Sequence, residues 1–217
     1  MCCKGTFNQK LIEILINAGY VILSQKLYVS KKYYTSYEKY KRSRTYLSSY
    51  FMCALIYYEY PILFLSKLKE PKISLIKYNK YELKINTEFE NIIDNCIKYH
   101  GKEWLTEPLK NVLIKIFNEN KNIQMICFGL YRDNEIKAGE FGIIIGKMYI
   151  SYTSYHEENS SGTIQMIKTF RYLKNIGIIC CNLFGLGKGN DYKYKFGTIN
   201  LLRDEYIKLF RELCNDI

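Results

Sequence analysis

The stretch IQMICFGLYRDNEIKAGEFGIIIGKMYISYTS, residues 123–154, decides the fold of this protein. It contains three runs that suit antiparallel strands, namely Ile123–Tyr131, Ile136–Ile145 and Met148–Ser154. The pairs Asp133-Asn134 and Gly146-Lys147 separate these runs, and such residues adopt the backbone angles that short hairpin turns require. The stretch therefore predicts a three-stranded antiparallel meander.

Apolar residues at helical spacing occur on both sides of this meander. Thr87 and Glu90 read as a capping box, which predicts a helix that continues to Tyr99. The other predicted elements are a helix from Glu107, a helix over Thr163–Asn175, a strand over Ile178–Phe184, a helix over Arg203–Leu213 and a short helix over Gln9–Ala18. Helices on either side of a mostly antiparallel sheet are typical of α+β proteins with an acetyltransferase-like layout. We expect that fold for residues 85–217, after a small N-terminal region, 1–84, that is basic and rich in tyrosine.

The composition predicts a compact protein that meets a negatively charged partner. Of the 217 residues, 48% are hydrophobic and 24% are charged, as in ordinary globular proteins. The formal net charge of +11 suits a nucleic acid, an anionic membrane surface or an acidic protein, and charge alone does not choose among them. Because Glu59 and Pro61 interrupt the apolar run from Tyr50 to Leu65, no transmembrane helix is predicted.

The eight cysteines favour buried free thiols in a reducing compartment. None of them has the C-x-x-C spacing of zinc ligands, so we expect no metal, and no other cofactor is implied. Acylation of Cys2 and Cys3 stays open. Without a clear targeting segment, the cytoplasm is the default expectation for the location. Separately, we expect a monomer.

A basic segment rich in tyrosine lies between Lys26 and Tyr46. Lysine and arginine neutralise phosphates and tyrosine rings stack on unpaired bases, so the segment suits a tRNA surface. The alternative is a solvated insertion whose composition reflects an AT-rich coding bias. The candidate tRNA-binding residues are Lys31, Lys32, Lys39, Lys41, Arg42 and Arg44.

Several short motifs, taken together and in order, resemble one enzyme family. They are AGEFG at 138–142 with GKMYISY at 146–152, Glu103-Trp104-Leu105, NSSGT at 159–163, and Asp191-Tyr192-Lys193 followed by Phe196-Gly197. This order is similar to that of the leucyl/phenylalanyl-tRNA-protein transferases, and more closely to their eukaryotic relatives. The similarity covers roughly residues 85–213, with weaker similarity at Phe7–Leu23 and Pro61–Ile76.

The resemblance implies a reaction. Family members take Leu, Phe or a similar residue from an aminoacyl-tRNA and join it to the N-terminal amine of a protein whose first residue is charged, which marks that protein for degradation. The implied partners are therefore an aminoacyl-tRNA as donor and a protein or peptide N-terminus as acceptor. Because the aminoacyl ester is already activated, the enzyme mainly has to place a neutral amine against the ester carbonyl and stabilise the oxyanion.

Two residues depart from the family at its catalytic positions. The family's aspartate at the end of the strand after the pocket helix corresponds to Asn182, and a glutamine of the bacterial enzymes corresponds to Phe184. An amide cannot serve as a carboxylate base, although Asn182 is able to orient the amine or to donate a hydrogen bond to the oxyanion.

Further candidates follow from the same resemblance. Glu140 stands where bacterial members have an apolar pocket residue, and its carboxylate can hold the donor's α-ammonium or take a proton from the acceptor. Its alternative role is that of an edge carboxylate paired with a lysine. Tyr152 replaces a pocket glutamate, Tyr149 lies in the same matched strand, and Trp104 either stacks on the terminal adenine or packs in a core. The loop-to-helix turn at Ser160, Ser161 and Thr163 suits a donor phosphate.

Two other functions compete with the transferase. An acetyl-CoA-dependent N-acetyltransferase would share the fold, but Ser160-Ser161-Gly162-Thr163 does not match its usual pyrophosphate loop. A catalytically inactive tRNA-binding or adaptor protein is the non-enzymatic alternative, and the amide at Asn182 favours it.

Overall fold

The computed structural model describes residues 2–4, 9–17, 21–30, 46–55, 59–101, 104–119, 124–183 and 190–214. The chain forms two compact units. The first comprises Met1–Ile56 and Gly101–Lys115, and the second comprises Tyr57–His100 and Ile116–Ile217. Helix α5 (Glu107–Glu119), which the sequence predicts from its first residue, begins in the first unit and ends in the second.

The first unit contains a three-stranded antiparallel sheet with the order β1-β3-β2. These strands are β1 (Cys2–Lys4), β2 (Val21–Ser30) and β3 (Tyr46–Leu55), and helix α1 (Gln9–Asn17) lies between β1 and β2 in the sequence. α1 confirms the predicted N-terminal helix. β2 and β3 are not predicted by the sequence, because polar residues and tyrosines interrupt the apolar alternation that identifies a strand. The six basic residues proposed for tRNA, between Lys31 and Arg44, lie outside the described residues.

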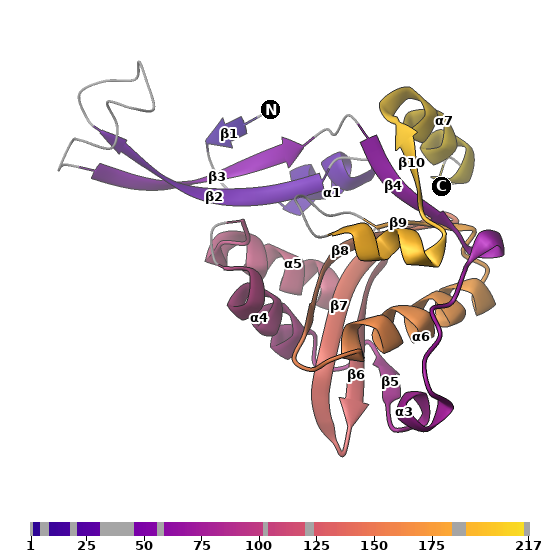
Figure 1. The fold of residues 1–217 in the computed structure, drawn as a ribbon. Coiled ribbons are helices and arrows are strands. Elements are labelled where there is room, and N and C mark those ends of the chain that lie inside the picture. Colours follow the sequence, from indigo (N-terminus) through magenta and orange to yellow (C-terminus); the bar gives the residue numbers. More distant parts are fainter. Residues whose placement is uncertain are drawn as a thin grey trace. The chain divides into compact units, whose positions relative to one another are not determined.

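The second unit is built on a seven-stranded sheet (Figure 1). Its strands lie in the order β10-β4-β9-β8-β7-β6-β5, and each neighbouring pair is antiparallel except β8 and β9. The strands are β4 (Glu59–Phe64), β5 (Glu82–Ile85), β6 (Gln124–Arg132), β7 (Glu135–Ile145), β8 (Met148–His156), β9 (Cys180–Asn182) and β10 (Ile199–Leu202). This mostly antiparallel sheet with helices confirms the predicted α+β class.

The predicted meander corresponds to β6, β7 and β8. Asp133 and Asn134 have φ angles of 54° and 63°, and Gly146 has a φ angle of 54°, so both predicted turns use left-handed backbone. β4, β5 and β10 are not predicted. β4 is missed because it contains Pro61, and a proline inside an apolar run argues against an inner strand. β4 nevertheless lies between β9 and β10, and the Pro61 carbonyl accepts a hydrogen bond from the Leu183 N–H at 2.9 Å.

The helices of this unit are α3 (Leu75–Asn79), α4 (Phe89–His100), α6 (Ser161–Asn175) and α7 (Arg203–Cys214), with 3-10 helices η1 (Leu65–Lys67) and η2 (Asn190–Phe196). α4, α6 and α7 begin within two residues of their predicted starts. The predicted strand at 178–184 is shorter, because only Cys180–Asn182 pairs with neighbouring strands.

α4 and α6 cover opposite faces of the sheet. Phe89 of α4 packs edge-on against Phe141, with 5.3 Å between ring centroids, whereas Gln165 of α6 donates a hydrogen bond to Glu140. Consecutive side chains of a strand point to opposite faces. From Ala138 to Ile145, beyond the register shift at Lys137, the even-numbered residues of β7 therefore face α6 and the odd-numbered residues face α4.

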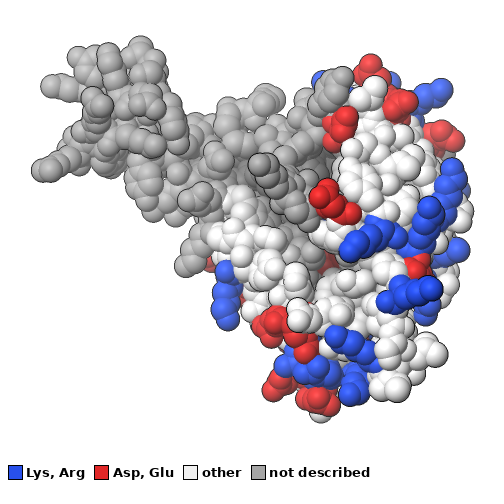
Figure 2. Space-filling model, viewed as in Figure 1, with Lys and Arg blue, Asp and Glu red and all other residues white. Residues whose placement is uncertain are grey.

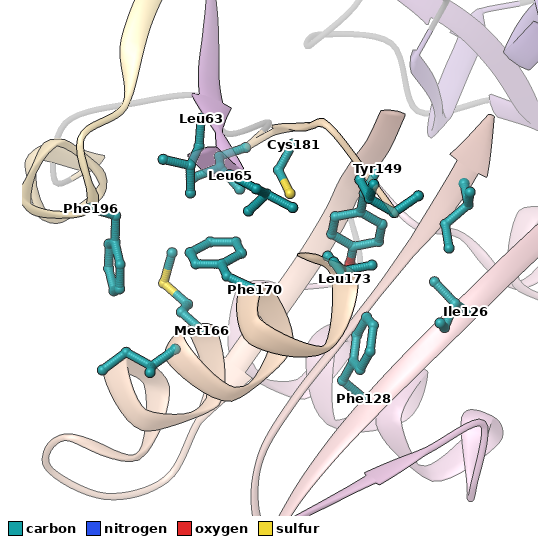
Figure 3. Packing of buried hydrophobic residues seen from close by; sticks show 14 residues of the cluster. Leu63, Leu65, Ile126, Phe128, Tyr149, Met166, Phe170, Leu173, Cys181 and Phe196 are labelled. Carbon is teal, nitrogen blue, oxygen red and sulfur yellow. The ribbon is translucent and has the colours of Figure 1, made fainter. Parts of the chain in front are cut away.

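The largest described core lies between the sheet and α6 (Figure 3). Tyr149, Phe128 and Phe170 are fully buried there, and Phe196 joins from η2 with its ring 5.4 Å from that of Phe170. Burial of several aromatic and aliphatic side chains holds α6 and η2 against the sheet. Among the described residues, no helix is long and apolar enough to cross a membrane.

Candidate active site where strands β8 and β9 diverge

The only parallel strand pair of the seven-stranded sheet separates after three residues. β8 and β9 pair at Met148 with Cys180, at Tyr149 with Cys181 and at Ile150 with Asn182. β9 ends at Asn182, whereas β8 continues to His156. In the part of the chain that the structure describes, no strand pairs with Ser151–His156 on the β9 side. Within this stretch, the Ser154 carbonyl oxygen lies 2.6 Å from Nε2 of His100 on α4.

A β-bulge in β8 lies at the same place. Gly142 pairs with Ser151 and Phe141 pairs with Thr153, so Tyr152 is the additional residue. Tyr152 is 6% exposed and stacks on Phe141 with 5.6 Å between ring centroids. A bulge changes the direction of the side chains around it. Ser151 still points toward Glu140 on the α6 side, whereas the bulge leaves both Tyr152 and Thr153 on the side of Phe141.

Glu140 is buried in the centre of β7 and accepts three hydrogen bonds. Its Oε1 atom accepts from the Tyr149 hydroxyl at 2.9 Å and from the Ser151 hydroxyl at 2.7 Å. Its Oε2 atom accepts from the Gln165 amide at 2.7 Å. Neutral donors of this kind compensate a carboxylate that is only 3% exposed. The alternative of an edge carboxylate is wrong, because β7 has a neighbouring strand on each side.

Gly142 allows this arrangement. A Cβ atom there would lie 2.3 Å from the Ile150 carbonyl oxygen and 2.5 Å from the Tyr149 ring. Without a side chain at 142, the Tyr149 ring crosses β7 and reaches Glu140. Burial, and then the charge of Glu140, raises the pKa of Tyr149, so its hydroxyl remains a proton donor.

Asn182 is fully buried at the end of β9. Neither Nδ2 nor Oδ1 makes a hydrogen bond of normal geometry with the described residues. The Tyr206 hydroxyl of α7 lies nearby: burial raises the pKa of Tyr206, and the interaction with Asn182 partly opposes that rise. Buried amides normally satisfy both atoms, so a bound molecule is a candidate to supply the missing partner.

Asn182 and Glu140 lie on opposite faces of the sheet. Strand pairing places Asn182 beside Ile150, and Cys181 beside Tyr149. Tyr149 points toward α6 and Glu140, so Asn182 points to the other face, where it meets Tyr206. The described pairing of β8 with β9 ends at Asn182, so Glu140 and Asn182 flank the end of that pairing from opposite faces of the sheet.

Lys193 of η2 also lies in this region, although its local sequence, Asp191-Tyr192-Lys193, does not distinguish it from a surface lysine. It is 6% exposed, and its Nζ donates to the carbonyl oxygen of Leu183, the residue after β9, at 2.8 Å. The Thr198 hydroxyl donates to the Lys193 carbonyl at 2.9 Å and fixes its backbone. Burial lowers the pKa of Lys193 to about 8, although the charge of Glu140 acts in the opposite direction.

The start of α6 combines an exposed and a buried serine. Ser160 has a φ angle of 72°, and its hydroxyl accepts a hydrogen bond from Lys77 Nζ at 3.0 Å. Ser161 is fully buried and donates to the Glu158 carbonyl at 2.8 Å. Thr163 is partly buried in the first turn of the helix. The Ser160 and Thr163 side chains are the more accessible ones here.

Two further candidates are not part of the described site in the second unit. Trp104 belongs to the first unit, where it is partly buried. Phe184 lies outside the described residues. Among the described residues, no group of three or more His, Cys, Asp or Glu side chains is placed to hold a metal ion.

Basic side chains are not confined to the N-terminal segment. Figure 2 shows Lys and Arg along the edge of the second unit where Figure 1 places η1 and the C-terminal end of α6. On α6, Arg171 binds Glu70 through two contacts of 2.7 and 2.6 Å and donates to the Tyr78 hydroxyl at 3.1 Å. Lys168 Nζ lies 4.0 Å from the centroid of the same tyrosine ring. This surface suits a polyanion.

The fold and the site define a class: a mixed α+β protein in which a carboxylate, an amide and an amine are buried near the end of the described parallel strand pair. The family model for leucyl/phenylalanyl-tRNA protein transferase matches residues 62–211. The chain therefore belongs to the leucyl/phenylalanyl-tRNA-protein transferase family.

Relatives in this family are similar over part of their length. One from Campylobacter jejuni subsp. doylei is 25% identical over 138 residues, which cover 63% of this chain and 60% of the relative. Another from Idiomarina loihiensis is 22% identical over 142 residues, which cover 62% and 57%. The chain thus spans about 60% of the length of such relatives. A solved structure, a conserved protein of unknown function from Bacteroides thetaiotaomicron, is 14% identical with a TM-score of 0.46 and covers 67% of this chain and 57% of its own.

Proposed function

We propose that this protein is an aminoacyl-tRNA-protein transferase that moves Leu or Phe from a charged tRNA to the N-terminal amine of a protein with a charged first residue, tagging it for degradation. Membership of the family supports this reaction. The observation that carries it is the divergence of β8 and β9 between Glu140 and Asn182. We further propose that the protein acts as a monomer in the cytoplasm and needs no cofactor.

We propose an acetyltransferase-like architecture for the second unit. Its support is one parallel pair, β8 and β9, within an antiparallel sheet, joined through α6. In such a layout, the gap between the parallel strands admits an acyl group, and the first turn of the connecting helix faces the donor. Ser160, Ser161 and Thr163 would contact donor phosphate there. We propose the division into a basic region, 1–84, and a transfer region, 85–217, as a division of function. It is not a division of the sheet, because β4 and β5 belong to the seven-stranded sheet.

The two proposed catalytic residues would act on different groups. The Asn182 amide, for which the described residues supply no hydrogen bond of normal geometry, would donate to the oxyanion that forms on the ester carbonyl. Oε2 of Glu140 accepts one hydrogen bond, from the Gln165 amide. This oxygen would accept a second hydrogen bond from the α-ammonium of the transferred amino acid. Preorganised groups of this kind require no rearrangement when charge develops.

The remaining candidates would shape the donor pocket. Tyr149, Tyr152 and Phe184 would line it with aromatic surface that suits Leu or Phe. Trp104 would stack on the terminal adenine of the tRNA. The six basic residues between Lys31 and Arg44 would bind tRNA phosphates.

One observation favours a second function, a catalytically inactive tRNA-binding or adaptor protein. Asn182 replaces the family's aspartate, so the chain lacks that carboxylate base. An acetyl-CoA-dependent N-acetyltransferase is the other alternative on this architecture.

A transfer assay separates these functions. The purified protein is incubated with tRNA charged with labelled leucine and with four peptides that begin with Arg, Lys, Asp or Glu. Label on a peptide supports the transferase and identifies its acceptor class. Binding of the tRNA without label on any peptide supports the inactive protein, and label transferred only from acetyl-CoA supports the acetyltransferase.

A further inference from the structure

We propose that Lys193 is the acid–base residue of the transfer reaction: its amine takes a proton from the acceptor's α-ammonium and returns a proton to the departing ribose oxygen of the tRNA. The proposal rests on the transferase function stated above. It assigns a catalytic role to a side chain whose position in the fold, and not its sequence context, singles it out.

The position of Lys193 carries the inference. Its Nζ lies 2.8 Å from the Leu183 carbonyl oxygen, so the amine is held directly beyond the end of β9 and one residue from Asn182. η2 lies next to α6 (Figure 1) and is anchored there by Phe196, which packs against Phe170. Lysine is seldom buried to 6% exposure unless a specific interaction retains it. This lysine is therefore built into the candidate site and is not part of the solvated basic surface.

The reaction needs a group that moves protons, and the other candidates are poorly suited. An α-ammonium must lose a proton before its nitrogen attacks, and the ribose oxygen must gain one when it leaves. Asn182 does not titrate. The Glu140 carboxylate already accepts hydrogen bonds from three side chains, two on one oxygen and one on the other, so most of its lone pairs are engaged within the protein.

The surroundings of Lys193 suit proton exchange near neutrality. Burial lowers its pKa to about 8, so both the amine and the ammonium are populated under physiological conditions. Among the described residues, the Glu140 carboxylate from β7 acts on Lys193, and the Tyr192 phenol of η2 has its ring centroid 5.9 Å from Nζ. Burial, with Glu140 and Tyr99, raises the pKa of Tyr192 to about 12, so that phenol stays neutral. The charge of Glu140 favours the lysine ammonium that forms during the reaction.

The step balances in protons and electron pairs. Neutral Lys193 removes one proton from the acceptor ammonium, and the freed nitrogen pair forms a bond to the ester carbonyl carbon. When the tetrahedral intermediate collapses, the C–O bond to the ribose breaks with its electron pair on oxygen. Lys193 gives its proton to that oxygen, and the extra proton on the new amide nitrogen goes to water. Lysine is left neutral, and one proton is released per transfer.

Substitutions separate a proton-transfer role from a structural or purely electrostatic one. Lys193→Met keeps the aliphatic stem and removes the amine. Lys193→Arg keeps the positive charge but stays protonated throughout the physiological range. Lys195→Met is the matched control, because Lys195 lies on the same 3-10 helix and is exposed. Each variant is assayed for transfer of labelled leucine to the peptide that the unmodified protein accepts, with far-UV circular dichroism and tRNA binding as checks of folding.

We expect kcat to fall about 10²–10⁴-fold in both Lys193 variants, with little change in KM for tRNA or peptide. The control should retain the unmodified rate. Between about pH 6 and about pH 9, the ratio of unmodified to Lys193→Met rates should rise as lysine loses its proton, and this ratio cancels the titration of the acceptor amine. A tertiary amine, which cannot itself be acylated, should partly restore the rate of Lys193→Ala.

Other outcomes reject the role. Full activity of Lys193→Arg would show that charge alone matters, and full activity of Lys193→Met would remove Lys193 from the mechanism while leaving the transferase function intact. If the unmodified protein binds leucyl-tRNA but transfers nothing, the proposed function fails first, and the role of Lys193 fails with it.

Discussion

Replacing Tyr149 with Phe tests the buried hydrogen-bond cluster around Glu140. The substitution keeps the aromatic ring, which is fully buried, and removes the hydroxyl that lies 2.9 Å from Oε1 of Glu140. A hydrogen bond to a charged group contributes about 1.5–3 kcal/mol, and both partners are too deeply buried for bulk water to replace the lost donor. The free energy of unfolding should therefore fall by about 1.5–3 kcal/mol at neutral pH. At 2–4 °C per kcal/mol for a protein of this size, the melting temperature should fall by about 3–12 °C.

Urea unfolding monitored by circular dichroism measures this change, and a double-mutant cycle with Glu140→Gln assigns it to the pair. Tyr99→Phe is the control, because Tyr99 is 52% exposed on α4 and should change stability by less than about 0.5 kcal/mol. A Tyr149→Phe protein as stable as the unmodified one, or a cycle with no coupling, would refute a stabilising role for the hydroxyl.

Three further substitutions test other parts of the site and its surroundings. Gly142→Ala places a Cβ atom 2.3 Å from the Ile150 carbonyl oxygen, so stability should fall by about 1–3 kcal/mol or more in thermal unfolding, whereas a neutral effect would show that the strands separate easily. Asn182→Leu removes a buried amide without normal partners; it should raise stability by about 1–3 kcal/mol and abolish transfer, and a less stable variant would mean that the amide is satisfied in the free protein. Arg171→Met removes the main cause of the lowered pKa of Glu70, so it should cost at most about 1 kcal/mol at neutral pH, because the pair is partly exposed. That contribution is present above the ordinary glutamate pKa and is lost as pH falls through the lowered value, so a loss of stability that persists at about pH 2 would contradict the ion-pair explanation.

The candidate site buries three polar side chains of different chemistry, Glu140, Asn182 and Lys193. A carboxylate, an amide and an amine are all at most 6% exposed there. Removing such groups from water strengthens their interaction with a substrate. The hydrogen-bonding capacity of the Asn182 amide is not used by the described residues. A buried amide without hydrogen bonds lowers stability, and functional sites often carry such a cost, so we expect Asn182→Leu to be more stable.

Much of the second unit follows from local sequence alone. Alternating and apolar runs, with Asp133-Asn134 and Gly146-Lys147 at the turns, specify the meander, because side-chain period and turn chemistry are local properties. The 3.6-residue period specifies α4, α6 and α7 for the same reason. The family resemblance directed attention to Glu140 and Asn182, and both lie beside the opening of the sheet.

Tertiary structure alone decided how these elements form a site. The strands β4, β5 and β10 are short, and their pairing partners are distant in sequence, so no local pattern identifies them. The side on which Asn182 lies depends on its register with Ile150, and a shift of one residue would reverse it. Lys193 has the sequence context of an ordinary surface lysine. Only the packing of Phe196 against Phe170 places its amine at the end of β9, where burial changes its pKa and Glu140 can act on its charge.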